Sequence, residues 1–159
     1  MKNLKYITLA ITTFAIDMHF KNRTEKWTDA RDAEVPTGKF ITRRKHHNRG
    51  LPLNIAEEHQ SKIALLSFGT TIILTVLYIF TLSKSKRQLL KTALSLQIGG
   101  AYSNTYDRIK RKYVVDYFSF NVPGKLKNIV FNIADIAIFL GSFLTILDSI
   151  IPHQDTEMD

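Results

Sequence analysis

Three acidic residues in the second half of the chain stand at the edges of apolar segments. Asp107 and Asp135 each close an Asn-x-x-Asp run, which begins at Asn104 or Asn132, and Asp116 lies between the two runs. A carboxylate is costly in a segment that is otherwise compatible with lipid, so it usually has a function there. Two carboxylates held close together in a poorly solvated place share one proton, so that one is a general acid while the other activates water. Aspartic peptidases use this chemistry, which needs neither a metal nor an organic cofactor.

Asp116 and Asp135 are the candidate catalytic pair. No Lys or Arg stands three or four residues from Asp135, so no partner on the same helix face neutralises it. In a helix that begins at residue 129, Asp135 would lie about 9 Å along the axis, just below the lipid headgroups. The i, i+3 spacing would also place Asn132 on the same helix face as Asp135. Asp116 can reach this place only through tertiary folding, and Asn104 or Asn132 would orient the acids or hold a peptide backbone.

The other charged residues have simpler structural interpretations. Asp107 is next to Arg108, and a scaffold ion pair between them is the favoured interpretation because buried charges need partners. Asp17 and Lys21 have the i, i+4 spacing of a helical ion pair, although their place near the end of an apolar segment leaves a role in substrate binding open. Ser103 is interpreted as a small packing residue.

The apolar segments of the sequence predict a single integral-membrane domain over residues 1–159. It is 45% hydrophobic, yet its mean hydropathy is only -0.07 because apolar and polar residues are segregated. We predict an all-α membrane fold, a bundle of four transmembrane helices at residues 4–20, 63–82, 89–106 and 129–151. Gly100 lies in a run of small residues that lets helices approach closely. A cleaved signal peptide is the alternative interpretation of the first segment, although no small-x-small cleavage site follows it.

The segment after the first apolar run is too long to be a bare connection. We predict a small extracytoplasmic cap at residues 22–62, rich in β-structure. It would contain a turn at residues 36–38, a strand at 39–43, a second turn at 48–50 and a surface helix at 53–64. The connection at residues 83–87 is short and basic, which predicts that it faces the cytoplasm and that the cap faces outward.

Composition and charge exclude several classes of function. The chain has no cysteine, so disulfides, thiol catalysis and cysteine zinc sites are excluded. The net charge of +8 accompanies apolar segments without a nucleic-acid motif, so anionic membrane lipids are the expected counter-charge, not nucleic acid. Histidines occur at positions 19, 46, 47 and 59 without metal-ligand spacing, and we predict no metal and no cofactor.

Five motifs in chain order resemble those of the lipoprotein signal peptidases (signal peptidase II). Residues 99–108 contain Asn-Thr-Tyr-Asp-Arg, residues 113–117 contain Val-Val-Asp-Tyr, and residues 131–138 contain Phe-Asn-Ile-Ala-Asp. Residues 17–21 are similar to the family's Asp-Gln-x-x-Lys motif, and residues 47–50 to its His-Asn-x-Gly motif.

The resemblance implies four transmembrane helices with a β-rich cradle in the bacterial cytoplasmic membrane, and an active site near the extracytoplasmic face. It implies a peptidase that cleaves diacylglyceryl-modified prolipoproteins just before the lipidated cysteine and that globomycin-type lipopeptides inhibit. It places the catalytic pair at Asp116 and Asp135. Supporting or substrate-contacting positions would be Asn48, Asn104, Arg108, Asn132, Asp17 and Lys21, and Asp107 and Gly100 would be structural.

The chain departs from the family pattern at several positions. Ser103 replaces a glycine, Met18 a glutamine and Ser119 a second aspartate, and Leu-Pro-Leu at residues 51–53 stands where the family has Ala-Ala-Phe. The altered loop motivates an alternative, a non-catalytic membrane protein that binds lipopeptides or lipoproteins on the same scaffold. A proton-coupled transporter that uses Asp135 as a relay is a third hypothesis.

Overall fold

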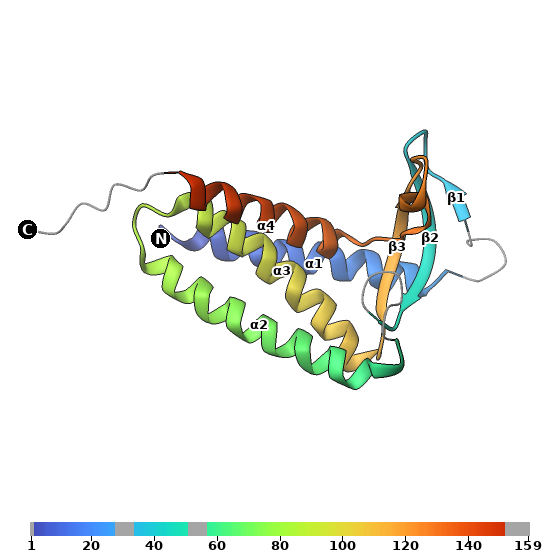
Figure 1. Cartoon of the computed structure of the whole chain (residues 1–159), viewed down its shortest axis with the longest axis horizontal. Coiled ribbons are helices and arrows are strands. Elements are labelled where there is room, and N and C mark those ends of the chain that lie inside the picture. Colours follow the sequence, from blue (N-terminus) through green and yellow to red (C-terminus); the bar gives the residue numbers. More distant parts are fainter. Residues whose placement is uncertain (1, 28–33, 51–56, 152–159) are drawn as a thin grey trace, which may run out of the picture.

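The computed structural model describes residues 2–27, 34–50 and 57–151, which form four long helices and a small sheet. The helices are α1 (Leu4–Glu25), α2 (Gln60–Ser83), α3 (Gln88–Lys110) and α4 (Ile133–Ile150). The strands are β1 (Glu34–Pro36), β2 (Ile41–Asn48) and β3 (Val114–Phe120), and the short 3₁₀ helices are η2 (Glu57–His59) and η3 (Lys125–Asn128). The helices form a bundle with the sheet across one end, while α1 begins and α4 ends at the opposite end (Figure 1).

Helix α3 is the central helix of the bundle, because it packs against α1, α2 and α4. Glycine makes two of these contacts possible. A Cβ atom on Gly99 would lie 2.5 Å from the carbonyl oxygen of Ala10 in α1, and one on Gly100 would lie 2.6 Å from that of Ala134 in α4. The run of small residues therefore brings backbones together, as the sequence predicted.

Two of the four helices, α2 and α4, are long and apolar enough to cross a membrane, judged by length and composition over the described residues. Within these apolar windows only 17% and 22% of the residues are buried. Large apolar side chains therefore face outward, including Leu65 (71% exposed), Phe80 (67%) and Phe139 (76%). Outward apolar faces of this extent are typical of contact with lipid or with another protein.

The central helix α3 is not among these two because it contains many polar residues, several of which are buried in the bundle. Ser95 donates to the hydroxyl of Tyr78 at 3.2 Å, and the Gln97 amide donates to Thr145 Oγ1 at 2.8 Å. Hydrogen bonds of this kind join helices when the alternative is an unsatisfied polar group. The predicted number of four membrane-spanning segments therefore stays a prediction, whereas the mostly helical fold with a small sheet is confirmed.

The sheet is antiparallel with the order β1-β2-β3. Its third strand, β3, comes from the connection between α3 and α4 and so lies outside residues 22–62, where the sequence predicted the cap. The register pairs His46 with Asp116, and an irregularity interrupts the pairing between Arg43 and His46. Strand β3, which carries Asp116, therefore lies at the end of the bundle where α4 begins (Figure 1).

Several predicted boundaries require correction. The strand predicted at residues 39–43 runs from Ile41 to Asn48, and the fourth helix begins at Ile133 and not at residue 129. Of the surface helix predicted at 53–64, residues 53–56 lie outside the described residues, and Gln60–Ala64 is the first part of α2. Both predicted turns are present: Gly38 has φ +95, and Gly50 N–H donates to Asn48 Oδ1 at 3.1 Å.

Candidate active site

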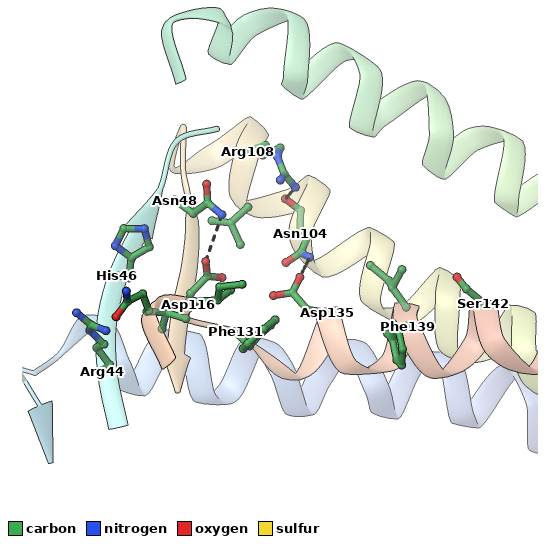
Figure 2. A pocket seen from close by; sticks show the side chains of 15 residues that line it. Arg44, His46, Asn48, Asn104, Arg108, Asp116, Phe131, Asp135, Phe139 and Ser142 are labelled. Atoms are coloured by element: carbon green, nitrogen blue, oxygen red, sulfur yellow. Dashed lines mark hydrogen bonds between the residues drawn. The ribbon is translucent and has the colours of Figure 1, made fainter. Parts of the chain in front are cut away.

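The fold brings Asp116 and Asp135 to one cavity of about 540 Å³. Asp116 lies on β3 and is 2% exposed, and Asp135 lies in the first turn of α4. Figure 2 shows both carboxyl groups pointing into this cavity, with Asn48 and Asn104 beside them. The two acids therefore converge although nineteen positions separate them in the chain.

Asn132 ends the extended segment before α4 and caps the helix. Its side chain accepts a hydrogen bond from Asp135 N–H at 2.8 Å, and Asp135 Oδ2 accepts one from Asn132 N–H at 3.1 Å. This reciprocal pair is a capping box, which fixes the start of the helix. The i, i+3 pair predicted for a helix face thus takes the form of a capping box, with Asn132 just before the helix and Asp135 in its first turn.

Amide side chains connect the two carboxyl groups. Asn132 Nδ2 donates to Asp116 Oδ1 at 2.7 Å, and Asn48 Nδ2 donates to Asp116 Oδ2 at 3.3 Å. Asn104 Nδ2 donates to Asp135 Oδ1 at 2.9 Å and its oxygen accepts from Asn132 at 3.2 Å. Asn132 thus contacts both acids, one through its side chain and the other through its backbone and the capping box.

Burial is the main cause of the shift in the pKa of the Asp116 carboxyl. It raises the pKa of Asp116 well above the usual value of 3.8, and the charge of Asp135 acts in the same direction. The charge of Lys21 and the hydrogen bonds from Asn48 and Asn132 oppose this shift. An acid in such a place keeps its proton at a pH where an exposed aspartate is ionised, which is what a general acid requires.

A buried ionic cluster lies behind the acids. Lys21 Nζ is 2.8 Å from Asp17 Oδ2 and 3.2 Å from Asp107 Oδ2, and all three side chains are fully buried. The Lys21 ammonium also donates to Asn104 Oδ1 at 2.8 Å and to Ser103 Oγ at 3.1 Å. Lys21 therefore holds the amide that contacts Asp135, and its charge already has partners within the protein.

Asp107 forms ion pairs, but not with Arg108, the partner that the sequence suggested. It pairs with Lys21 and with Arg111 (3.3 Å), and its Oδ2 accepts from Val115 N–H at 3.1 Å, which anchors the start of β3. Arg108 instead lines the cavity that contains Asp116 and Asp135. Its guanidinium lies 3.5 Å from the carbonyl oxygens of Asn104 and Gly50.

Two residues of this cluster escaped the sequence analysis. Ser103 is not merely a packing residue, because it donates to Asp17 Oδ2 at 2.6 Å. Tyr117 donates to Asp17 Oδ1 at 2.9 Å and accepts from Ile133 N–H at 3.0 Å, so it ties α1 to the first residue of α4. The alternation of a strand, which turns Tyr117 away from the face of Asp116, was the signal that could have revealed it.

The predicted site residues thus divide into two groups. Asn48, Asn104, Arg108, Asp116 and Asp135 line the cavity, together with Arg44 and His46 at its edge (Figure 2). Asp17, Lys21, Asp107 and Asn132 lie behind it as supports, and Gly100 sets the spacing of α3 and α4. Within residues 2–27, 34–50 and 57–151, no three acidic or histidine side chains gather in a way that could hold a metal ion.

The comparisons with known proteins agree with this geometry. The family model for Signal peptidase (SPase) II matches residues 9–151, a range that includes both acids. The chain belongs to the signal peptidase II family. A lipoprotein signal peptidase of Clostridium tetani is 38% identical over 100 residues, which cover 63% of each chain. The protein of the same name from Clostridium acetobutylicum is 36% identical over 98 residues, and that from Methylocella silvestris 42% over 82.

These aligned stretches span less than two thirds of each relative, namely 63%, 62% and 47% of their lengths. Two solved structures, both described as bacterial membrane enzymes, share the fold of this member of the signal peptidase II family. One has a TM-score of 0.76 at 23% identity and covers 98% of this chain and 94% of that chain. The other has a TM-score of 0.75 at 24% identity, with 96% and 94% covered.

Proposed function

We propose that this chain is an aspartic endopeptidase that removes the signal peptide from diacylglyceryl-modified prolipoproteins, cleaving before the lipidated cysteine. The observation that carries the proposal is the pair of acids, Asp116 and Asp135, which share one cavity and are joined by Asn132. Membership of the signal peptidase II family supports the substrate class. The outward apolar faces of α2 and α4 support a place in the bacterial membrane, where a lipidated substrate resides.

In the proposed reaction the two acids hold one proton between them. One acid carries this proton and the other is the base. The base takes a proton from water as the water oxygen attacks the scissile carbonyl carbon, and the protonated acid gives its proton to the carbonyl oxygen. The tetrahedral intermediate then breaks its C–N bond: the acid that took the water proton gives it to the leaving amine, the other acid takes a hydroxyl proton from the intermediate, and the signal peptide ends in a carboxyl group. Because the sites are coupled, the titration belongs to the pair and not to one residue.

We further propose that all four helices cross the cytoplasmic membrane, with the cavity near the extracytoplasmic face. The connection at the far end of the bundle carries Lys84, Lys86 and Arg87, and basic connections favour the cytoplasmic side. Arg87 is 2.7 Å from Asp148 near the end of α4, so this end holds a charged pair away from the cavity. The lipidated substrate would enter sideways from the membrane, and the cavity would also admit globomycin-type lipopeptides as inhibitors.

A gel-shift assay with a lipidated prolipoprotein tests the proposal. The wild-type chain should convert the substrate to the smaller mature form, and Asp116→Asn and Asp135→Asn should each abolish the conversion. Glu58→Gln is the matched control, because it removes an exposed carboxylate near the same end of the bundle. Unchanged cleavage by Asp135→Asn would remove the mechanism.

The non-catalytic alternative depends on the segment from Gly50 to residue 53, of which residues 51–53 lie outside the described residues. Binding of globomycin by the wild-type chain, without turnover of any lipidated peptide, would favour it over the peptidase.

A further inference from the structure

A second cavity, of about 300 Å³, lies between the start of α2 and the end of α3. Three cationic side chains line it, those of Arg49, Arg108 and Lys112, together with the hydroxyl of Ser61. No carboxylate is among its described lining residues. The cavity is therefore positively charged and offers hydrogen-bond donors, which is the chemistry of an anion site.

Of the three cations, Arg108 has carboxylates nearby, those of Asp135, Asp116 and Asp107, whereas Arg49 and Lys112 differ from it. Neither the Arg49 nor the Lys112 side chain makes a hydrogen bond or an ion pair with another described residue. Lys21 differs in this respect, because its ammonium has four partners. Both side chains are exposed, so, as far as the described residues go, Arg49 and Lys112 can contact an external anion.

The backbone at Lys112 supports this interpretation. Lys112 has φ 70, in the left-handed region that glycine or asparagine adopts more easily than lysine. Its N–H donates to the carbonyl oxygen of Asp107 at 3.1 Å, so this conformation ends α3. A lysine thus occupies a position where glycine or asparagine would be less strained, and its side chain lines the cavity.

The cavity also has an apolar side. Ile63 and Ala64 of α2 and Ile109 of α3 line it, and Ile109 is 43% exposed on the outer surface of the bundle. A ligand that fills this cavity would place an anionic group among the cations and an apolar part against the helices. This combination of charge and apolar surface fits an anionic phospholipid better than a free anion.

We propose that this cavity binds the phosphate group of an anionic phospholipid, with the acyl chains along α2 and α3. The proposal depends on the proposed membrane location but not on catalysis. Arg108 lines both this cavity and the one with Asp116 and Asp135, and in Figure 2 it lies at the margin of the catalytic cavity on the side of α2. The lipid phosphate would therefore lie on one side of Arg108, and the catalytic cavity would lie on the other side of the same residue.

Native mass spectrometry of the purified full chain in detergent measures this binding directly. The probes are phosphatidylglycerol, phosphatidylcholine and free glycerol phosphate. Phosphatidylglycerol should bind at least about tenfold more tightly than phosphatidylcholine, and the double variant Arg49→Gln/Lys112→Asn should lose about tenfold of that affinity. Asparagine suits the left-handed conformation, so Lys112→Asn is expected to fold as well as the wild type.

The matched control is Lys26→Gln/Lys110→Gln, which removes the same charge from exposed positions that do not line the cavity. It should change the affinity less than twofold. Equal losses in the two double variants would show a general surface charge effect and overturn the proposal. Equal binding of the two phospholipids would overturn it too. If free glycerol phosphate saturated the cavity at the same concentration as phosphatidylglycerol, the site would bind a free phosphate and the proposed lipid ligand would be wrong. Because none of these readouts uses proteolysis, their failure is distinct from failure of the proposed function.

Discussion

Replacing Lys21 by methionine removes the only cation that contacts both Asp17 and Asp107 among the described residues. Lys21→Met is expected to lower the free energy of unfolding by about 3 kcal/mol, toward the lower end of the range for breaking a buried ion pair. The lower end applies because each carboxylate keeps other partners. Asp17 keeps the hydroxyls of Ser103 and Tyr117, and Asp107 keeps Arg111 and a backbone N–H.

The double variant Lys21→Met/Asp17→Asn tests whether the cost arises from an unpaired charge. Its remaining carboxylate, Asp107, still has Arg111, so the double variant should be about 1–2 kcal/mol more stable than Lys21→Met alone. Denaturant unfolding in detergent, followed by tryptophan fluorescence, measures the free energies of unfolding of the wild type, Lys21→Met and the double variant. Lys26→Met is the control, since Lys26 is exposed, and should change stability by less than about 0.5 kcal/mol. A double variant less stable than Lys21→Met would refute the reasoning.

Three further predictions concern the packing, the support of α4 and the buried acid. Gly100→Ala should cost about 1–3 kcal/mol, because the new Cβ would lie 2.6 Å from the carbonyl oxygen of Ala134; denaturant unfolding measures it. Tyr117→Phe should cost about 1–3 kcal/mol in the same assay, because Ile133 N–H loses its acceptor. Asp116→Asn should become more stable relative to the wild type as the pH rises above about 4, by at most about 1.4 kcal/mol per pH unit, in melting curves recorded at several pH values.

The sign of the last prediction follows from the direction of the shift. Burial raises the pKa of Asp116 in the folded wild type, so the unfolded wild type releases this proton at a lower pH than the folded state does. As the pH rises, the free energy of unfolding of the wild type therefore falls, whereas Asp116→Asn has no such proton to lose. A difference between variant and wild type that is the same at every pH would contradict it. Gly69→Ala is the control for the packing prediction, because nothing lies within 4 Å of its Cβ, and Tyr106→Phe, at a position 42% exposed, is the control for Tyr117→Phe. Losses as large in these controls as in the tested variants would contradict the two predictions.

The sequence could predict that Asp116 and Asp135 come together, because each stands in a motif whose residue types and order are specific. It could not predict the local structure around them. The i, i+3 spacing of Asn132 and Asp135 fits both a helix face and a capping box, and only the extended segment before α4 decides between them. Sequence neighbours also misled at Asp107, because adjacent residues on a helix point in different directions, and its partners come from Lys21 and from Arg111 one turn later.

Membrane segments were harder to assign than the motifs, again for a physical reason. The central helix α3 hides polar side chains in the bundle, so its composition gives a weak apolar signal although the helix is long. The alternating side chains of β3 were not taken as a strand, because a short run of apolar residues is ambiguous without its partners. Its pairing with β2 sets His46 opposite Asp116, and the Asn48 side chain donates to Asp116 across 68 positions of the chain, which no local pattern contains.

The pH dependence of kcat/KM for cleavage of a lipidated prolipoprotein most directly tests whether Asp116 and Asp135 work with one shared proton. A bell-shaped profile is expected, with activity lost in acid when both carboxyl groups are protonated and lost at high pH when the shared proton leaves. Because burial raises the pKa of Asp116, the alkaline limb should lie well above the usual aspartate value of 3.8. A rate that lacks an alkaline limb, or that still shows both limbs in Asp116→Asn, would contradict a shared proton.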